Sequence, residues 1–165
     1  MISFGPVPSR RLGRSLGINN IPAKICTYSC VYCQVGKTTR MQIDRTAFYQ
    51  PEKILRDVES KIEKAQQKGE SIDYLTFVPD GEPTLDVNLG KEIELLKPLG
   101  FKIAVITNGS LIWRKDVRTE LAQVDWVSFK MDTLTEKKWY RINRPHRFLK
   151  QSAILRDMAA FANDY

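Results

Sequence analysis

The sequence FKIAVITNGS, residues 101–110, places a nearly continuous apolar run directly before the pair Asn108-Gly109. A strand with one solvent-facing side alternates polar and apolar residues, whereas an unbroken apolar run is typical of a strand buried on both faces. The Asn-Gly pair is a strong turn signal and ends the run. We therefore expect a central strand of a parallel sheet here, followed at once by a loop.

Strand and helix signals alternate on either side of this stretch. Apolar segments rich in β-branched or aromatic residues predict three further strands, at 16–21, 72–78 and 124–130. Apolar residues at helical spacing predict helices at 51–68, 88–97, 114–122 and 147–162. This order predicts an α/β fold with a parallel sheet of about four βα units, either doubly wound or rolled into part of a barrel.

The composition fits one ordinary globular domain. Of the 165 residues, 42% are apolar and 27% are charged, which excludes wholesale disorder and fibrous repeats. No run approaches the about 18 apolar residues of a membrane span. The start, MISFGPVPSRR, lacks the apolar core of a secretory signal. We therefore expect a cytoplasmic protein without membrane contact, and the net charge of +7 favours anionic partners in general.

Polar side chains follow each predicted strand. They are the cysteines after 16–21, Gly81-Glu82-Pro83 after 72–78, Asn108 after 101–107, and Lys130 with Asp132 after 124–130. Ligands of parallel α/β folds bind at the carboxyl ends of the strands, in open sheets and in barrels alike. The four loops are therefore expected to converge on one site.

The three cysteines of the chain, Cys26, Cys30 and Cys33, lie within eight residues of one another. An odd number without an export signal makes a disulfide framework unlikely. Thiolates at C-x3-C-x2-C spacing can bind three corners of a 4Fe-4S cluster and leave the fourth iron open. A structural zinc ion is the alternative, but its fourth ligand would be the distant His146, the one histidine of the chain.

Residues 26–33, CTYSCVYC, resemble the C-x3-C-x-aromatic-C signature of radical S-adenosylmethionine (SAM) enzymes. The resemblance implies a 4Fe-4S cluster whose open iron binds the amino and carboxylate groups of SAM. One electron from the reduced cluster would cleave SAM to methionine and a 5′-deoxyadenosyl radical, which removes a hydrogen atom from a substrate. It also implies a TIM-like barrel, here a partial one.

The same resemblance implies roles for the other loops. Tyr32 resembles the aromatic residue beside the adenine, and Gly81-Glu82-Pro83 is similar to a GGEP-like segment that binds the methionine ammonium. Asn108, Lys130 and Asp132 stand where similar enzymes bind the carboxylate and ribose of SAM.

Each of these assignments has a plainer alternative. The segment departs from the family pattern at its first glycine, which is Asp80 here, and Glu82 alone is equally typical of a simple turn. Asn108-Gly109 is equally a turn, and a lysine at a strand end is usually solvated.

Three more segments resemble a narrower group, the iron–sulfur oxidoreductases related to wyosine-forming tRNA enzymes. These segments are FGPVPSRRLG at 4–13, CQVGKT at 33–38 and INRPH at 142–146. The resemblance implies a radical SAM oxidoreductase but leaves the substrate unknown. RNA is one candidate substrate because of the basic residues Arg10, Arg11, Arg14, Arg141, Arg144, Arg147 and Lys150.

Similar enzymes usually build six βα units, whereas this chain stops after about four. We therefore expect one radical SAM domain, 1–165, truncated before the last two units, with an open sheet edge that a second copy or a partner covers. The resemblance also implies a reducing electron donor such as flavodoxin or ferredoxin. A non-catalytic cluster-binding fragment or scaffold is the alternative function.

Overall fold

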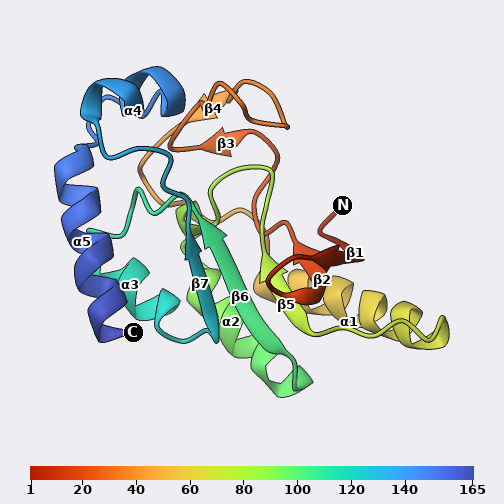
Figure 1. Cartoon of the computed structure of the whole chain (residues 1–165). Helices are drawn as coiled ribbons and strands as arrows, with labels where there is room; N and C mark the ends of the chain where they lie inside the picture. The colour runs from red at the N-terminus through yellow and green to blue at the C-terminus, as the bar shows by residue number, and fades with distance from the viewer.

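The computed structural model describes the whole chain, residues 1–165, and is built on a five-stranded sheet (Figure 1). In spatial order the strands are β1 (Ser3–Ser9), β2 (Gly13–Ile18), β5 (Tyr74–Phe77), β6 (Lys102–Thr107) and β7 (Trp126–Phe129). β2, β5, β6 and β7 run parallel, and β1 is antiparallel to β2. The predicted α/β class with a mostly parallel sheet is confirmed.

Helices connect and follow the parallel strands. They are α1 (Pro51–Gln67), α2 (Leu89–Leu96), α3 (Lys115–Leu121), α4 (Glu136–Asn143) and α5 (Gln151–Asp164). Two short 3₁₀ turns flank α2: η1 (Pro83–Leu85) and η2 (Lys97–Leu99). α1 begins with Pro51 in its first turn and buries Ile54, Val58 and Ile62 along one stripe, as its apolar spacing predicts.

The apolar core lies between the sheet and the helices. Ile103 and Val105 of β6 are fully buried in one cluster with Ile54 of α1 and Ile93 of α2. Ala104, between them on the opposite face of β6, is also fully buried. The prediction of a strand buried on both faces is therefore confirmed.

β1 was not expected, because its Gly- and Pro-rich sequence does not resemble a strand. It pairs with β2 as an antiparallel edge, and Phe4 lies opposite Gly17. A Cβ atom built on Gly17 would lie 2.2 Å from the Phe4 ring, so only glycine leaves room for the ring there. The sheet therefore has an additional strand on the β2 side.

Two predicted boundaries were wrong. The first parallel strand ends at Ile18 rather than at residue 21, since Ile18 is the last residue that pairs with β5. The last helix begins at Gln151 rather than near residue 147, because the short helix α4 precedes it. α4 ends at Asn143, and the left-handed backbone of the next residue, Arg144 (φ 44°), turns the chain away from the helix.

The cysteines lie in an excursion between β2 and α1. It contains a two-stranded parallel pair, β3 (Ile25–Cys26) and β4 (Arg40–Met41). Figure 1 shows this pair and α4 together at the top of the view, above the ends of β6 and β7. The excursion therefore covers the carboxyl ends of the parallel strands.

β7 forms the other edge of the sheet, with Trp126 38% exposed. The last parallel strand is thus an edge strand, and its covering by a second copy or a partner stays a prediction. No helix has the length and apolar character needed to cross a membrane.

Candidate cofactor-binding site

A cleft of about 600 Å³ opens at the carboxyl ends of the parallel strands. Except for Pro83, every residue predicted for the site lines it: Cys26, Cys30, Tyr32, Cys33, Gly81, Glu82, Asn108, Lys130 and Asp132. Pro83 lies behind the cleft, where it begins η1 and is buried. Loops that are far apart in sequence therefore meet as expected from their places after the strands.

The cysteine sulfurs receive hydrogen bonds from neighbouring groups. Cys26 Sγ accepts from the Tyr28 amide (3.5 Å) and from Asn108 Nδ2 (3.6 Å). Cys30 Sγ accepts from Asn143 Nδ2 (3.4 Å), whereas Cys33 is exposed. Hydrogen bonds of this kind tune thiolates that hold iron–sulfur clusters.

The Cys26 thiol is held in its neutral form. Burial, with the nearby Glu82 carboxylate, raises the pKa of Cys26 from 9.0 to about 12. Iron binds the thiolate, so loading a cluster would displace this proton.

The cysteine side chains do not form a closed site for a single metal ion. No three Cys, His, Asp or Glu side chains are arranged to hold one metal ion, as a closed zinc site requires. In a 4Fe-4S cluster each thiolate binds a different iron, so the three sulfurs need not converge on one point. Three thiolates suit an iron–sulfur cluster by their chemistry, and the assignment of a 4Fe-4S cluster to them stays a prediction.

Glu82 is a buried carboxylate that accepts several hydrogen bonds. Its Oε1 accepts from the amide and hydroxyl of Thr84 (3.1 and 2.6 Å) and from the Thr107 hydroxyl (2.5 Å). Its Oε2 accepts only from the Asn108 amide (2.9 Å). Burial raises the pKa of Glu82, and these donors oppose that rise. Because a carboxylate has about four acceptor sites, two on each oxygen, Oε2 retains one for a ligand.

Gly81 allows a close contact within the protein. A Cβ atom on Gly81 would lie 2.1 Å from the carbonyl oxygen of Ile25, and the Glu82 amide donates to that same oxygen (3.1 Å). The sequence predicts that Gly81 lets backbone approach the cofactor, whereas the close approach seen is to β3, one residue before Cys26. The Gly81 loop and the cysteine loop are thus packed directly together.

Asn108 links the strand ends to the cysteine loop. Its Nδ2 donates to the Thr27 hydroxyl (2.8 Å), and its Oδ1 accepts from the Ser110 amide (2.9 Å). Together with the hydrogen bond from its backbone amide to Glu82 Oε2, these contacts fix the orientation of Asn108 at the cleft.

Tyr32, Lys130 and Asp132 form a cluster at the opposite rim. The Tyr32 hydroxyl donates to Asp132, and Lys130 Nζ lies 4.4 Å from the centre of the Tyr32 ring. Asn143 Nδ2 also donates to Asp132 Oδ2 (2.6 Å). Partial burial and the bond to Asp132 raise the pKa of the Tyr32 hydroxyl.

The end of α4 holds the cysteine loop, which sequence reasoning did not foresee. The Ser29 amide donates to Asn143 O (3.0 Å), and the Val31 amide donates to Ile142 O (2.9 Å). In return the His146 amide donates to Thr27 O (2.9 Å). The sequence signal for this contact was the INRPH segment at 142–146. Its resemblance to the narrower group did not indicate that it contacts the cysteine loop.

Comparison with known proteins identifies the family of the chain. The family model of the Radical SAM superfamily matches residues 20–160. The chain belongs to the radical SAM superfamily. Members of this superfamily typically use a 4Fe-4S cluster and SAM.

Two relatives in the curated set are UPF0026 proteins. The chain is 58% identical over 164 residues to one from Methanocaldococcus jannaschii, covering 99% of this chain and 50% of that protein. It is 38% identical over 164 residues to one from Synechocystis, covering 98% of this chain and 60% of that protein. The chain therefore spans about half the length of these relatives.

Two solved structures share the fold of this chain. TYW1 with a lysine-pyruvate adduct bound gives a TM-score of 0.60 at 20% identity, over 87% of this chain and 50% of that one. SuiB of Streptococcus suis bound to S-adenosylmethionine gives 0.58 at 17% identity, over 87% and 30%. The predicted partial TIM-like fold is confirmed, and at these identities the likeness shows the fold alone.

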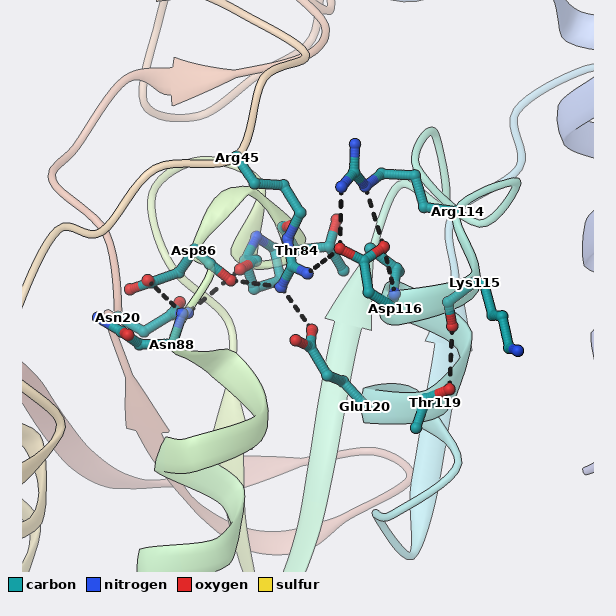
Figure 2. A network of polar contacts seen from close by, with 12 residues as sticks. Asn20, Arg45, Thr84, Asp86, Asn88, Arg114, Lys115, Asp116, Thr119 and Glu120 are labelled. Atoms are coloured by element: carbon teal, nitrogen blue, oxygen red, sulfur yellow. Dashed lines mark hydrogen bonds and ion pairs between the residues drawn. The ribbon is translucent and has the colours of Figure 1, made fainter.

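In this radical SAM fold, Arg45 contacts Thr84 and Asp86, which follow Glu82 in the chain (Figure 2). Its side chain is 3% exposed. Nε donates to Thr84 O (2.8 Å) and Nη2 to Asp86 O (2.5 Å). The guanidinium also pairs with Asp116 (2.9 Å) and Glu120 (2.5 Å) of α3. One buried arginine from the cysteine excursion therefore ties together the Glu82 loop and the helix after β6.

The basic residues considered for RNA binding fall into two regions. Arg10 and Arg11 lie in the turn between β1 and β2, and Arg14 lies at the amino end of β2. The others beyond residue 140 lie on α4 and in the connection to α5. The cleft lies at the carboxyl end of β2, away from Arg10 and Arg11, whereas the end of α4 borders it, since Asn143 lines the cleft.

Proposed function

We propose that the chain is the cofactor-binding domain of a radical SAM oxidoreductase. Cys26, Cys30 and Cys33 would hold a 4Fe-4S cluster with one iron open to SAM. The observation that carries the proposal is the convergence of all three cysteines and the other predicted SAM residues, apart from Pro83, on one cleft. When bound and reduced, this pair of cofactors supplies a 5′-deoxyadenosyl radical that abstracts a hydrogen atom from the substrate.

The protein residues would bind and orient SAM. The free acceptor site on Glu82 Oε2 suits the methionine ammonium, since a charged donor strengthens such a bond. Lys130 would bind the carboxylate as a point charge. Asp132 would accept from the ribose hydroxyls, and the Tyr32 ring would lie beside the adenine.

Other residues would position these contacts. Asn108 links Glu82 to the cysteine loop, because its backbone amide donates to Glu82 and its side chain donates to Thr27. Gly81 keeps the Glu82 loop against β3, and Pro83 begins the buried turn behind it.

The chemistry needs one electron from outside the chain. A flavodoxin or ferredoxin is the class of donor that we propose, since a cluster of this type requires a strong one-electron reductant. The exposed Cys33 marks where the cluster would come nearest to solvent.

Anaerobic reconstitution with iron and sulfide tests the proposal without a substrate. We expect a reduced cube-type electron paramagnetic resonance (EPR) signal that changes when SAM is added. A cluster signal indifferent to SAM would support the scaffold alternative. Stoichiometric zinc without a cluster would overturn the assignment of the cysteines.

A further inference from the structure

Asn143, the last residue of α4, donates hydrogen bonds to two side chains that line the cleft. Its Nδ2 donates to Cys30 Sγ (3.4 Å) and to Asp132 Oδ2 (2.6 Å). A side-chain amide nitrogen carries two hydrogens, so both bonds can form at the same time. Because Cys30 is assigned to the cluster and Asp132 to SAM, Asn143 connects the two proposed cofactor sites.

The orientation of the Asn143 amide follows from its surroundings. A cysteine sulfur and a carboxylate both accept hydrogen bonds, so an exchange of Nδ2 and Oδ1 would bring three acceptors together without a donor. Asn143 is 3% exposed, and its Oδ1 has no hydrogen-bond partner among the protein atoms. A buried carbonyl without a partner costs folding free energy. The favourable contribution of this side chain therefore lies in the two bonds of Nδ2.

Backbone bonds hold the end of α4 against the cysteine loop independently of the Asn143 side chain. The Ser29 amide donates to Asn143 O (3.0 Å), and the Val31 amide donates to Ile142 O (2.9 Å), on either side of Cys30. A substitution at residue 143 keeps both acceptors, because they are carbonyl oxygens of the main chain. Side-chain variants therefore test the bonds of Nδ2 separately from the anchoring of the loop.

Asp132 has acceptor sites that the protein does not use. The Tyr32 hydroxyl donates to the same oxygen, Oδ2, that accepts from Asn143, whereas no protein group donates to Oδ1. Asp132 is exposed at the rim of the cleft. Its carboxylate can therefore accept from hydroxyl groups of a ligand without losing its bond to Asn143.

The two neighbours of Asn143 have opposite effects on a cluster bound at Cys30. A donor to a cluster sulfur favours the reduced cluster, which carries one more negative charge, so it raises the reduction potential. The Asp132 carboxylate disfavours the added charge and draws on the same amide group. Ligand hydroxyls that donate to Asp132 offset part of its charge and leave the amide a stronger donor to Cys30.

We propose that Asn143 is a positioning residue that couples SAM binding to reduction of the cluster. Through Cys30 it raises the reduction potential, and through Asp132 it transmits the binding of SAM. The electron comes from the flavodoxin or ferredoxin class of donor named above. By linkage, the reduced protein binds SAM more tightly than the oxidised protein by the same coupling factor. This inference rests on the proposed function, because the roles of Cys30 and Asp132 are assigned there.

Potentiometric titration of the reconstituted protein, followed by its EPR signal with and without SAM, tests the coupling. Asn143→Ala should shift the midpoint potential to more negative values and reduce the positive shift that SAM produces. Asp132→Asn should shift the potential without SAM to more positive values, because it removes a charge but keeps an acceptor for Asn143. In the double variant, the effect of Asp132→Asn should be smaller than in the single variant, since it acts partly through Asn143.

Asn88→Ala is the matched control. Asn88 is half-buried, and its Nδ2 donates to Tyr49 O (3.2 Å), but it does not line the cleft. Its midpoint potential and its SAM-induced shift should equal those of the unchanged protein. Asn143→Leu is a second test variant, because it keeps a similar side-chain volume without a donor or a charge. It should shift the potential in the same direction as Asn143→Ala.

The response of the unchanged protein to SAM separates this inference from the proposed function. If SAM shifts its potential and shifts that of both Asn143 variants equally, the coupling through Asn143 is wrong while the proposed function stands. Equal effects of Asp132→Asn with and without the Asn143 side chain would also overturn the coupling. If the unchanged protein forms a cluster that is indifferent to SAM, the proposed function fails and the coupling fails with it.

Discussion

The Glu82 side and the Tyr32 side of the cleft are built in different ways. Glu82 is 1% exposed and accepts from three residues of two loops. Tyr32 is 41% exposed, and Asp132 is exposed at the same rim. Both sides are assigned to SAM, yet only the first is also part of the protein interior. Substitutions on the two sides should therefore change the free energy of unfolding by different amounts, even where they weaken SAM binding equally.

The largest expected effect is the loss of the cluster when a cysteine is replaced. Cys30→Ala should remove most iron and the brown colour, because a cluster held by two thiolates loses affinity. Iron and sulfide analysis after anaerobic reconstitution measures this. Full retention of both in the variant would contradict the ligand assignment.

Glu82→Ala should separate the two sides most clearly. It leaves the donors of Thr84, Thr107 and Asn108 unpaired in the interior, so the free energy of unfolding should fall by about 3 kcal/mol. Asp132→Ala, the control on the exposed side, should lower it by less than about 1 kcal/mol. Urea unfolding of the cluster-free protein measures both.

Both variants should also weaken the SAM-induced change of the EPR signal. If they destabilise the protein equally, the contrast between the two sides is wrong. If SAM changes the EPR signal of Glu82→Ala as it changes that of the unchanged protein, Glu82 does not bind SAM and only stabilises the turn.

Arg45→Lys tests whether the support behind Glu82 matters. Lysine keeps the charge but cannot reproduce the fork that reaches Thr84 O, Asp86 O and α3, so we expect a loss of about 2 kcal/mol in urea unfolding. Arg114→Lys is the control, since Arg114 is 32% exposed and pairs only with Asp116. Equal losses in the two variants would show that burial of Arg45 contributes nothing.

A pH dependence is expected from the buried acids next to the Glu82 loop. Glu92 and Asp86 are both fully buried. Burial, together with the Asp86 carboxylate, raises the pKa of Glu92 from 4.5 to about 9. The folded protein then binds more protons than the unfolded chain between these values, so stability should fall as pH rises from 4.5 towards 9.

Urea unfolding across this pH range measures the effect. Glu92→Gln cannot titrate, and its stability should vary less over the same range. A variant with the same pH dependence as the unchanged protein would assign the proton to another group.

The parts of the site that sequence could predict are those at strand ends. Lys130 and Asn108 follow apolar runs, and the carboxyl ends of parallel strands meet, so their approach follows from the pattern. Asn143 and Arg45 were missed because they look like ordinary surface polar residues. Their partners lie far away in sequence, 113 residues for Asn143 and Cys30 and 75 for Arg45 and Glu120. The local periodicity of a sequence predicts helices and strands but not contacts between residues so far apart.

The fold shows the same limit. β1 was missed because glycine and proline are unfavourable in strands, and its pairing with β2 outweighs that preference. α4 was missed because only Trp139 and Asn143 of its eight residues are buried, too few for an apolar stripe.

The bonds between the cysteine loop and residues 142–146 have a consequence for how the protein is made. All three cysteines leave the ribosome more than a hundred residues before the backbone groups that receive Ser29 and Val31. During synthesis the bonds of this loop to Thr38 and to the Glu82 loop can form before those to residues 142–146. The Ser29 and Val31 amides have their acceptors only once α4 is made, so we expect cluster insertion to be completed after α4 rather than on the appearance of the cysteines.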